Sequence, residues 1–143
     1  AIWAALETNP LIHSSTLGGN PLACAAGIAA VREIKRLNLP ARAASLGDKA
    51  LSTLRELQHS HPDIISDVRG RGLFMGVQFT DSDIAGLVIA GLAQRRVIAA
   101  YTLNNPYVIR IEPALTITEE QLDRGLDALA ESVEQTKAIL ASL

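Results

Sequence analysis

The order of helix-like and strand-like segments is the feature that most constrains the fold of this 143-residue chain. Apolar residues recur at helical spacing in some segments and alternate in others, and these two periodicities separate helices from strands. The order is helix, helix, strand, strand, helix, strand, strand, helix. It lacks the strict strand–helix alternation of a doubly wound sheet and has too few turns for a sandwich. We therefore predict an α+β fold, a small antiparallel or mixed sheet with helices packed on one face, preceded by a long helix.

Capping residues and helix breakers set the ends of the predicted helices. Asn20 and Pro21 suit the N-cap and first position of a helix that the following Asn38-Leu39-Pro40 run ends near Leu37. Thr118, with a glutamine three residues later, forms a capping box for the last helix. Two more helices are predicted, at residues 41–59 and 83–95.

The strands are predicted from short alternating or apolar runs. In "LFMGVQF" (73–79) every second residue is apolar, which indicates a strand with one buried face. "VIAA" (97–100) and "YVIRI" (107–111) are predicted to be strands, with the turn-forming "TLNNP" between them. "IISDVRGRG" (64–72) is interpreted as a short extended piece and a glycine turn.

Composition limits the partners that the chain can have. A formal net charge of −2 favours neither nucleic acid nor an anionic membrane surface. No apolar run is long enough to span a bilayer, and no signal peptide is recognised at the start. A single cysteine excludes an internal disulfide and fits a reducing compartment, so a cytoplasmic location is expected.

The stretch "HSSTLGGNPLACAAG" (13–27) has two interpretations. Hydroxyl groups and glycines before a helix N-terminus can bind an anion, because free backbone N–H groups and the helix dipole both favour negative charge. The segment is not a P-loop, since no Lys-Ser/Thr pair follows the glycines. A capped helix after a Gly-Gly turn is the commoner meaning of such a pattern, and spacing alone leaves both open.

Arg110 lies inside the apolar run "YVIRI". An arginine there needs solvent, a partner or a ligand, because burying it unpaired is costly, and its planar fork suits a carboxylate. Plain alternation offers a simpler explanation. It places Tyr107, Ile109 and Ile111 inward and leaves Val108 and Arg110 outward.

Other candidate residues have simpler interpretations. "VRGRG" (68–72) resembles RNA-binding runs, but in a chain without basic excess we interpret it as a tight turn with solvated arginines. A metal site is not expected, since Cys24 is the single thiol and is expected to be buried and structural. The remaining chemistry-bearing side chains are assigned no role; they are His13, His59 and His61, and three solvated lysines, Lys35, Lys49 and Lys137.

Several motifs together carry a family resemblance over essentially the whole chain. "HSSTLGGNPLACAAG" resembles the segment that opens a long helix in class III, ornithine-type pyridoxal-phosphate (PLP) aminotransferases. "TLNNPYVIRIEPALTITEEQ" resembles the C-terminal strand and helix of the same family. Together with "NLPA" and "RGRGLFMG" between them, these two stretches most resemble the sequences of putrescine aminotransferases. Leu17 stands where the family often has an aromatic residue.

The resemblance implies a fold type I dimer with its active site at the subunit interface. Residues 1–37 would be the end of the large domain and a connecting helix, and 38–143 the C-terminal small domain. Thr16, with Ser15 beside it, would bind the cofactor phosphate of the neighbouring subunit. Arg110 would bind a substrate carboxylate, typically that of 2-oxoglutarate or an amino acid.

The resemblance also implies that functional groups lie outside this chain. The family's Schiff-base lysine lies upstream of the Gly-Gly-Asn-Pro segment, so no catalytic residue is assigned here and this chain alone is expected to be an inactive C-terminal fragment. The parent enzyme would move an amino group from a diamine or ω-amino acid to an oxoacid. The alternatives are a free-standing binding or regulatory module, or a mutase, racemase or decarboxylase of the same class.

Overall fold

The computed structural model describes residues 3–9 and 14–142. Internal contacts divide the chain into two units, Ala1–Asn38 and Leu39–Leu143, each of which is described by itself. The division falls beside the predicted boundary between 37 and 38. Assignment of the first unit to the end of a large domain stays a prediction.

The first unit consists of two helices and the turn that precedes the second. Helix α1 spans Ala4–Thr8 and helix α2 spans Pro21–Arg36, with Asn20 as the N-cap of α2 as predicted. No residue of α2 is buried within this structure, and apolar side chains such as Ile28 are more than half exposed. The described residues therefore give the apolar side chains of α2 no core to pack into.

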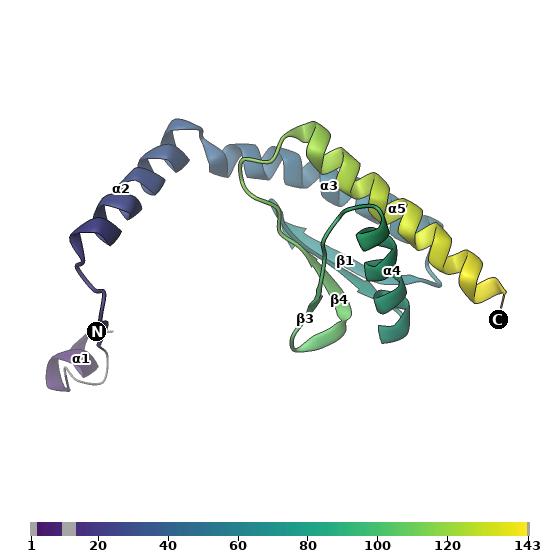
Figure 1. Ribbon diagram of the computed structural model, residues 1–143, viewed down its shortest axis with the longest axis horizontal. Coiled ribbons are helices and arrows are strands. Elements are labelled where there is room, and N and C mark those ends of the chain that lie inside the picture. Colours follow the sequence, from purple (N-terminus) through teal and green to yellow (C-terminus); the bar gives the residue numbers. More distant parts are fainter. Residues whose placement is uncertain (1–2, 10–13, 143) are drawn as a thin grey trace. The chain divides into compact units, whose positions relative to one another are not determined.

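The second unit is an antiparallel four-stranded sheet with three helices (Figure 1), as the α+β prediction required. The strand order is β1-β2-β4-β3. The strands are β1 (Ile65–Arg71), β2 (Phe74–Phe79), β3 (Tyr101–Thr102) and β4 (Asn105–Ile111), and the helices are α3 (Leu39–Ser60), α4 (Ser82–Gln94) and α5 (Glu119–Ala141).

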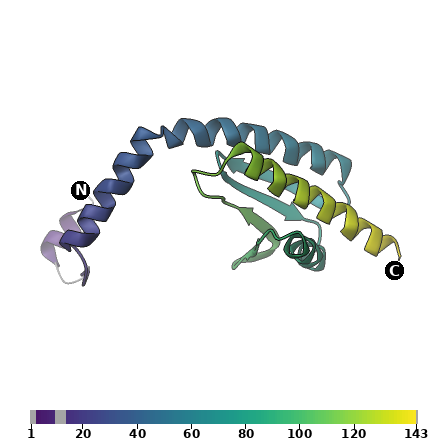
Figure 2. The ribbon, with the colours of Figure 1, turned by 45° about the horizontal axis from the view of Figure 1, so that its top comes forward.

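Apolar side chains from the helices and one face of the sheet form a single core. Helices α3 and α4 contact the sheet, and α5 packs against α3 and α4. Helices α3 and α5 run side by side in Figure 2. As predicted, alternate residues of the β2 segment are buried on this face. On α5, Leu122, Leu126, Leu129 and Val133 recur at helical spacing and are buried, whereas Leu140 near the end of the helix is 37% exposed.

Strand assignment differs from the prediction beside β4. Residues 97–100 are not a strand; the edge strand is Tyr101–Thr102, which begins after the predicted strand and ends on the first residue of the predicted loop. The cause is the short connection, because Thr102 pairs with Asn105 and the Thr102 hydroxyl donates to the Asn105 carbonyl oxygen at 2.8 Å. Turn formers thus close a hairpin here rather than a longer loop.

Two glycines allow α3 to lie against the β1–β2 turn. Gly72 has φ +57°, a conformation that glycine adopts without steric cost, and it forms the turn with Leu73. A Cβ atom on Gly47 of α3 would lie 2.2 Å from the Gly72 carbonyl oxygen. The helix can therefore approach this turn only because residue 47 has no side chain.

A β-bulge decides which side chains of β1 face the core. Ile65 pairs with Phe79, but the next pair is Asp67 with Gln78, so Ser66 is the extra residue. The Ser66 hydroxyl donates to the Gln78 carbonyl oxygen at 3.1 Å, which fixes the irregularity. The bulge lets Ile65 and Val68 face the core together although they are three residues apart. The polar residues of β1 therefore lie on the opposite face, which none of α3, α4 and α5 covers within the described residues of the second unit.

Candidate functional site

A tight turn precedes α2 at the predicted phosphate-binding segment. The Gly18 amide donates to the Ser15 carbonyl oxygen at 3.2 Å, and the Asn20 amide donates to that of Leu17 at 3.1 Å. Gly19 follows with φ +73°, in the left-handed region that favours glycine. The Gly-Gly pair therefore has a local structural role in bringing the chain to the start of α2.

The first-turn amides of α2 are occupied by its own N-cap. The Asn20 side-chain oxygen accepts hydrogen bonds from the amides of Leu22 and Ala23 at 3.0 and 3.1 Å. Pro21 has no amide hydrogen, and the Cys24 amide donates to the Asn20 carbonyl oxygen at 2.9 Å. This is the geometry of the capped helix, one of the two interpretations left open by the sequence. An anion at this segment would need donors other than the amides of Leu22 and Ala23.

The donors that remain lie in the turn itself. Ser15 and Thr16 are both exposed, and their hydroxyl groups have no hydrogen-bond partner among the described residues. The amides of Thr16, Leu17 and Gly19 likewise have no backbone partner within 14–142. Two hydroxyls and three amides of this turn are donors of the kind that the oxygens of a phosphate monoester accept.

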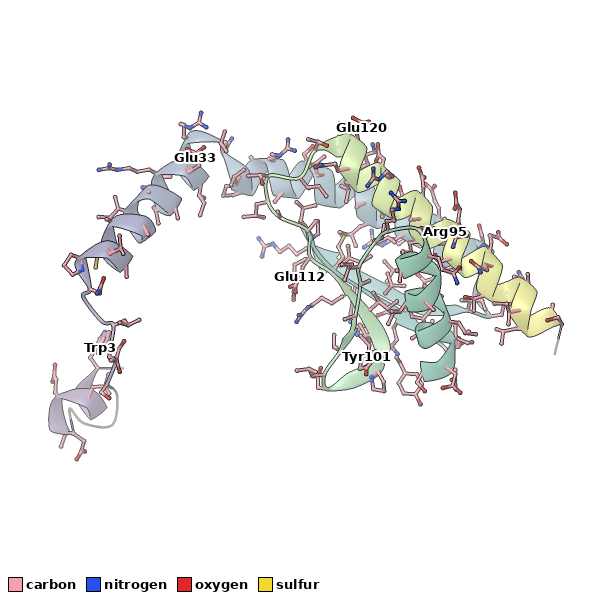
Figure 3. The ribbon with its side chains drawn as sticks, viewed as in Figure 1. Trp3, Glu33, Arg95, Tyr101, Glu112 and Glu120 are labelled. Atoms are coloured by element: carbon pink, nitrogen blue, oxygen red, sulfur yellow. The ribbon has the colours of Figure 1, made fainter. Side chains whose placement is uncertain are left out.

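Arg110 lies on the uncovered face of the sheet in the second unit. It pairs with Gly76 of β2, and its side chain is 51% exposed. The guanidinium Nε lies 2.8 Å from Oε1 of Glu112, which Figure 3 labels just beyond the end of β4. This ion pair leaves the terminal guanidinium nitrogens of Arg110 available for a carboxylate.

The alternation predicted for β4 is correct at Ile109 and Arg110 but wrong at Tyr107 and Val108. Ile109 is buried on the helix-covered face as predicted, whereas Tyr107 is 41% exposed and Val108 is only 5% exposed. Val108 lies on the other face beside Gly76, where an added Cβ atom would lie 3.5 Å from Val108 Cγ1. The uncovered face is therefore hollowed beside Arg110 and closed at Val108.

Sequence analysis missed two further residues of this face. Arg69 and Arg71 were interpreted as solvated turn residues, yet both belong to β1 and face the same side as Arg110. Arg69 donates from one terminal nitrogen to Asp67 at 2.5 Å and to Gln78 at 3.0 Å. The signal in the sequence was the two-residue spacing of Asp67, Arg69 and Arg71, which is typical of one strand face.

These side chains border a hollow of about 510 Å³, here named the arginine hollow. It extends over β1, β2 and β4 and the turn between β3 and β4, with Arg69, Gly76 and Arg110 among its lining residues. The structure thus brings Arg110 together with two arginines of "VRGRG". Ser15 and Thr16 belong to the other unit and are described by themselves as the second candidate site.

The remaining candidates support no further chemistry. Cys24 is exposed, contrary to the predicted buried role, because α2 has no buried residue. His61 is buried with its Nε2 atom 3.1 Å from Oε1 of Glu134, and His59 Nδ1 donates a hydrogen bond to the Arg55 carbonyl oxygen at 2.6 Å. His13 lies outside the described residues.

The residues that the structure describes contain neither a metal-binding cluster nor a membrane-spanning helix. Within 3–9 and 14–142, no group of three or more His, Cys, Asp or Glu side chains could hold a metal ion. Among the helices of the described segments, none is both long and apolar enough to cross a membrane.

Comparison with a protein-family model gives a match over most of the chain. Residues 2–133 match the model described as aminotransferase class-III. The chain belongs to the class III aminotransferases, a PLP-dependent family.

Solved structures agree with this assignment. The acetylornithine aminotransferase from Elizabethkingia anophelis is 35% identical with a TM-score of 0.78, over 86% of this chain and 31% of that one. The ornithine aminotransferase from Toxoplasma gondii is 32% identical with a TM-score of 0.80, over 88% of this chain and 30% of that one. The ornithine aminotransferase from Plasmodium yoelii is 30% identical with a TM-score of 0.78, over 87% of this chain and 32% of that one. The chain therefore spans about a third of the length of these relatives.

Proposed function

We propose that this chain is the C-terminal part of a PLP-dependent aminotransferase that moves an amino group from a diamine or ω-amino acid to 2-oxoglutarate or another oxoacid. The observation that carries the proposal is Arg110. It is a half-exposed arginine on an uncovered sheet face, and its acidic neighbour Glu112 occupies only one edge of the guanidinium. A guanidinium group with one edge still unoccupied is suited to bind a carboxylate through two parallel hydrogen bonds.

The cofactor role falls to the turn before α2. Ser15 and Thr16 would donate from their hydroxyl groups to the phosphate of PLP, together with amides of the same turn. In the proposed homodimer, this phosphate belongs to the neighbouring subunit. When bound, PLP supplies the electron sink that amino-group transfer needs.

The lysines of this chain support the proposal that it is inactive alone. Lys49 lies 2.8 Å from both Glu119 and Asp123, and these carboxylates, Asp123 first, raise the pKa of Lys49. A more strongly protonated amine is a poorer nucleophile. Lys137 lies 4.0 Å from Asp63 on the surface of the second unit, and Lys35 is exposed on α2.

The diamine donor and the oxoacid acceptor would place different demands on Arg110. A putrescine-like donor has no carboxylate, so Arg110 would serve only the acceptor half-reaction. In the enzyme that contains this segment, Arg110→Lys should raise the KM for 2-oxoglutarate far more than that for the diamine. An equal rise in both KM values would contradict this division of roles.

The first experiment uses the chain as it is. We would mix it with PLP, record the absorbance spectrum, reduce with borohydride and measure the intact mass. We expect no stoichiometric adduct on Lys35, Lys49 or Lys137. One stoichiometric adduct on a single lysine would show that this chain builds its own cofactor site, and the proposal of an inactive C-terminal part would be abandoned.

A further inference from the structure

The arginine hollow has a glycine between two arginines on adjacent strands. Gly76 of β2 pairs with Arg69 of β1 on one side and with Arg110 of β4 on the other. Directly paired residues project from the same face of a sheet, and neighbouring strands are about 4.8 Å apart. The two arginine Cα atoms therefore lie about 10 Å apart on one face, a separation that two arginine side chains can bridge around one small anion.

From this arrangement we infer that Arg69 and Arg110 together clamp one substrate carboxylate above Gly76. The inference rests on the proposed function of Arg110 and adds Arg69 as a second ligand and Gly76 as the floor of the site. It also implies a substrate class, since only a substrate with a carboxylate can use the clamp.

The existing hydrogen bonds leave suitable donors on both arginines. One terminal nitrogen of Arg69 is occupied by Asp67 and Gln78, which holds the side chain in place and leaves Nε and the other terminal nitrogen. On Arg110 the Nε edge faces Glu112, which leaves both terminal nitrogens. Each guanidinium thus keeps N–H groups that its present partners do not occupy. Those partners lie on opposite sides of the Gly76 row, so binding one carboxylate above Gly76 requires both side chains to turn toward it.

The charge of this face matches a single carboxylate. Three arginines, Arg69, Arg71 and Arg110, are accompanied by the carboxylates of Asp67 and Glu112, which leaves one positive charge. Arg71 has no hydrogen-bond or ion-pair partner among the described residues. A bound carboxylate would neutralise the remaining charge, whereas a diamine would be repelled.

Gly76 is not required by the backbone or by its neighbours. It has no positive φ, and the nearest atom to an added Cβ would be Val108 Cγ1 at 3.5 Å, an ordinary contact. Glycine inside a strand costs stability relative to residues with side chains, and it often marks a place where a ligand approaches the backbone closely. The absent side chain leaves the floor of the hollow open between the two arginines.

The test is an NMR titration of this chain with 2-oxoglutarate at constant ionic strength, following the Gly76 amide and the arginine Nε signals. We expect Arg69→Gln and Arg110→Gln each to raise the Kd roughly tenfold, because each removes charged hydrogen bonds to the ligand. Gly76→Ala should raise the Kd several-fold while the rest of the spectrum keeps its dispersion. Arg55→Gln, at an exposed arginine of α3 outside the hollow, is the matched control and should leave the Kd unchanged.

The outcomes separate this inference from the proposed function. If Arg110→Gln weakens binding and Arg69→Gln does not, the clamp is overturned and the role of Arg110 remains. If neither variant changes the Kd, or if 2-oxoglutarate leaves the Gly76 signal unmoved, both are overturned. Equal binding of inorganic phosphate with the same dependence on both arginines would overturn the carboxylate specificity, and putrescine should give no shift at Gly76.

Discussion

Helices α2 and α3 follow each other in the chain and differ completely in burial. Both have apolar residues at helical spacing, and Asn38, with φ +47°, separates them. Residues of α3 such as Leu54 pack into the core of the second unit, whereas no residue of α2 is buried. The difference shows that apolar periodicity identifies a helix face that needs a partner, but does not identify the partner.

The largest difference in stability is expected between a substitution in the core face of α3 and one on the exposed surface of α2. Leu54→Ala should lower the free energy of unfolding by about 3–5 kcal/mol, because Leu54 is 1% exposed and its loss leaves a cavity. Ile28→Ala, at a position 53% exposed, should change it by less than about 0.5 kcal/mol. Urea unfolding followed by circular dichroism measures both, and comparable losses would show that α2 is packed in solution.

The close approach of α3 to the β1–β2 turn should give the next effect. Gly47→Ala should destabilise the second unit by about 3 kcal/mol, since the new Cβ atom would overlap the backbone of Gly72. Gly125→Ala in α5 is the control, because nothing lies within 4 Å of its Cβ position and alanine favours helix. Similar stability of the two variants would mean that α3 does not contact this turn in solution.

The helix caps offer a smaller and more local comparison. Asn20→Ala removes the acceptor for two α2 amides, and Thr118→Ala removes half of the capping box of α5. Each should cost about 1 kcal/mol. Because α2 has no buried residue and α5 is packed, the first loss should appear as faster hydrogen exchange at Leu22 and Ala23 alone. The second should appear in global unfolding, and a global effect of Asn20→Ala would contradict the distinction.

The smallest effect should be a difference in pH dependence. Asp123 and Glu119 raise the pKa of Lys49 in the folded chain. The contribution of Lys49 to folding stability is therefore complete below the pKa of the unfolded chain. It is lost as the pH rises through the pKa of the folded chain, above about pH 10. Arg36 lowers the pKa of Glu33 in α2, so that contribution is present at neutral pH and is lost as the pH falls. Thermal unfolding of Lys49→Met and helicity of Glu33→Gln across pH measure these effects, and both should be small because the groups are exposed. If the melting temperature of the unsubstituted chain did not fall as the pH rises above about 10, the Lys49 prediction would be contradicted.

Local sequence signals predicted the elements well where one physical cue decided them. Asn20-Pro21 and the Thr118 capping box set helix starts that the structure confirms, because a cap is a contact between residues close in the chain. Alternation in the β2 segment predicted its buried face for the same reason. The helix ends and the edge strand at 101–102 were less predictable, since hairpin closure depends on pairing with β4.

The candidate site divides in the same way. The sequence by itself determined that Arg110 lies in a strand and that Ser15 and Thr16 precede a helix start. Only the tertiary structure decided that Arg69 and Arg110 share one sheet face across Gly76. That arrangement depends on the bulge at Ser66, which shifts the faces of β1, and on the strand order that places β2 between β1 and β4. Periodicity along one strand cannot specify which strand becomes its neighbour, because pairing is set by long-range packing.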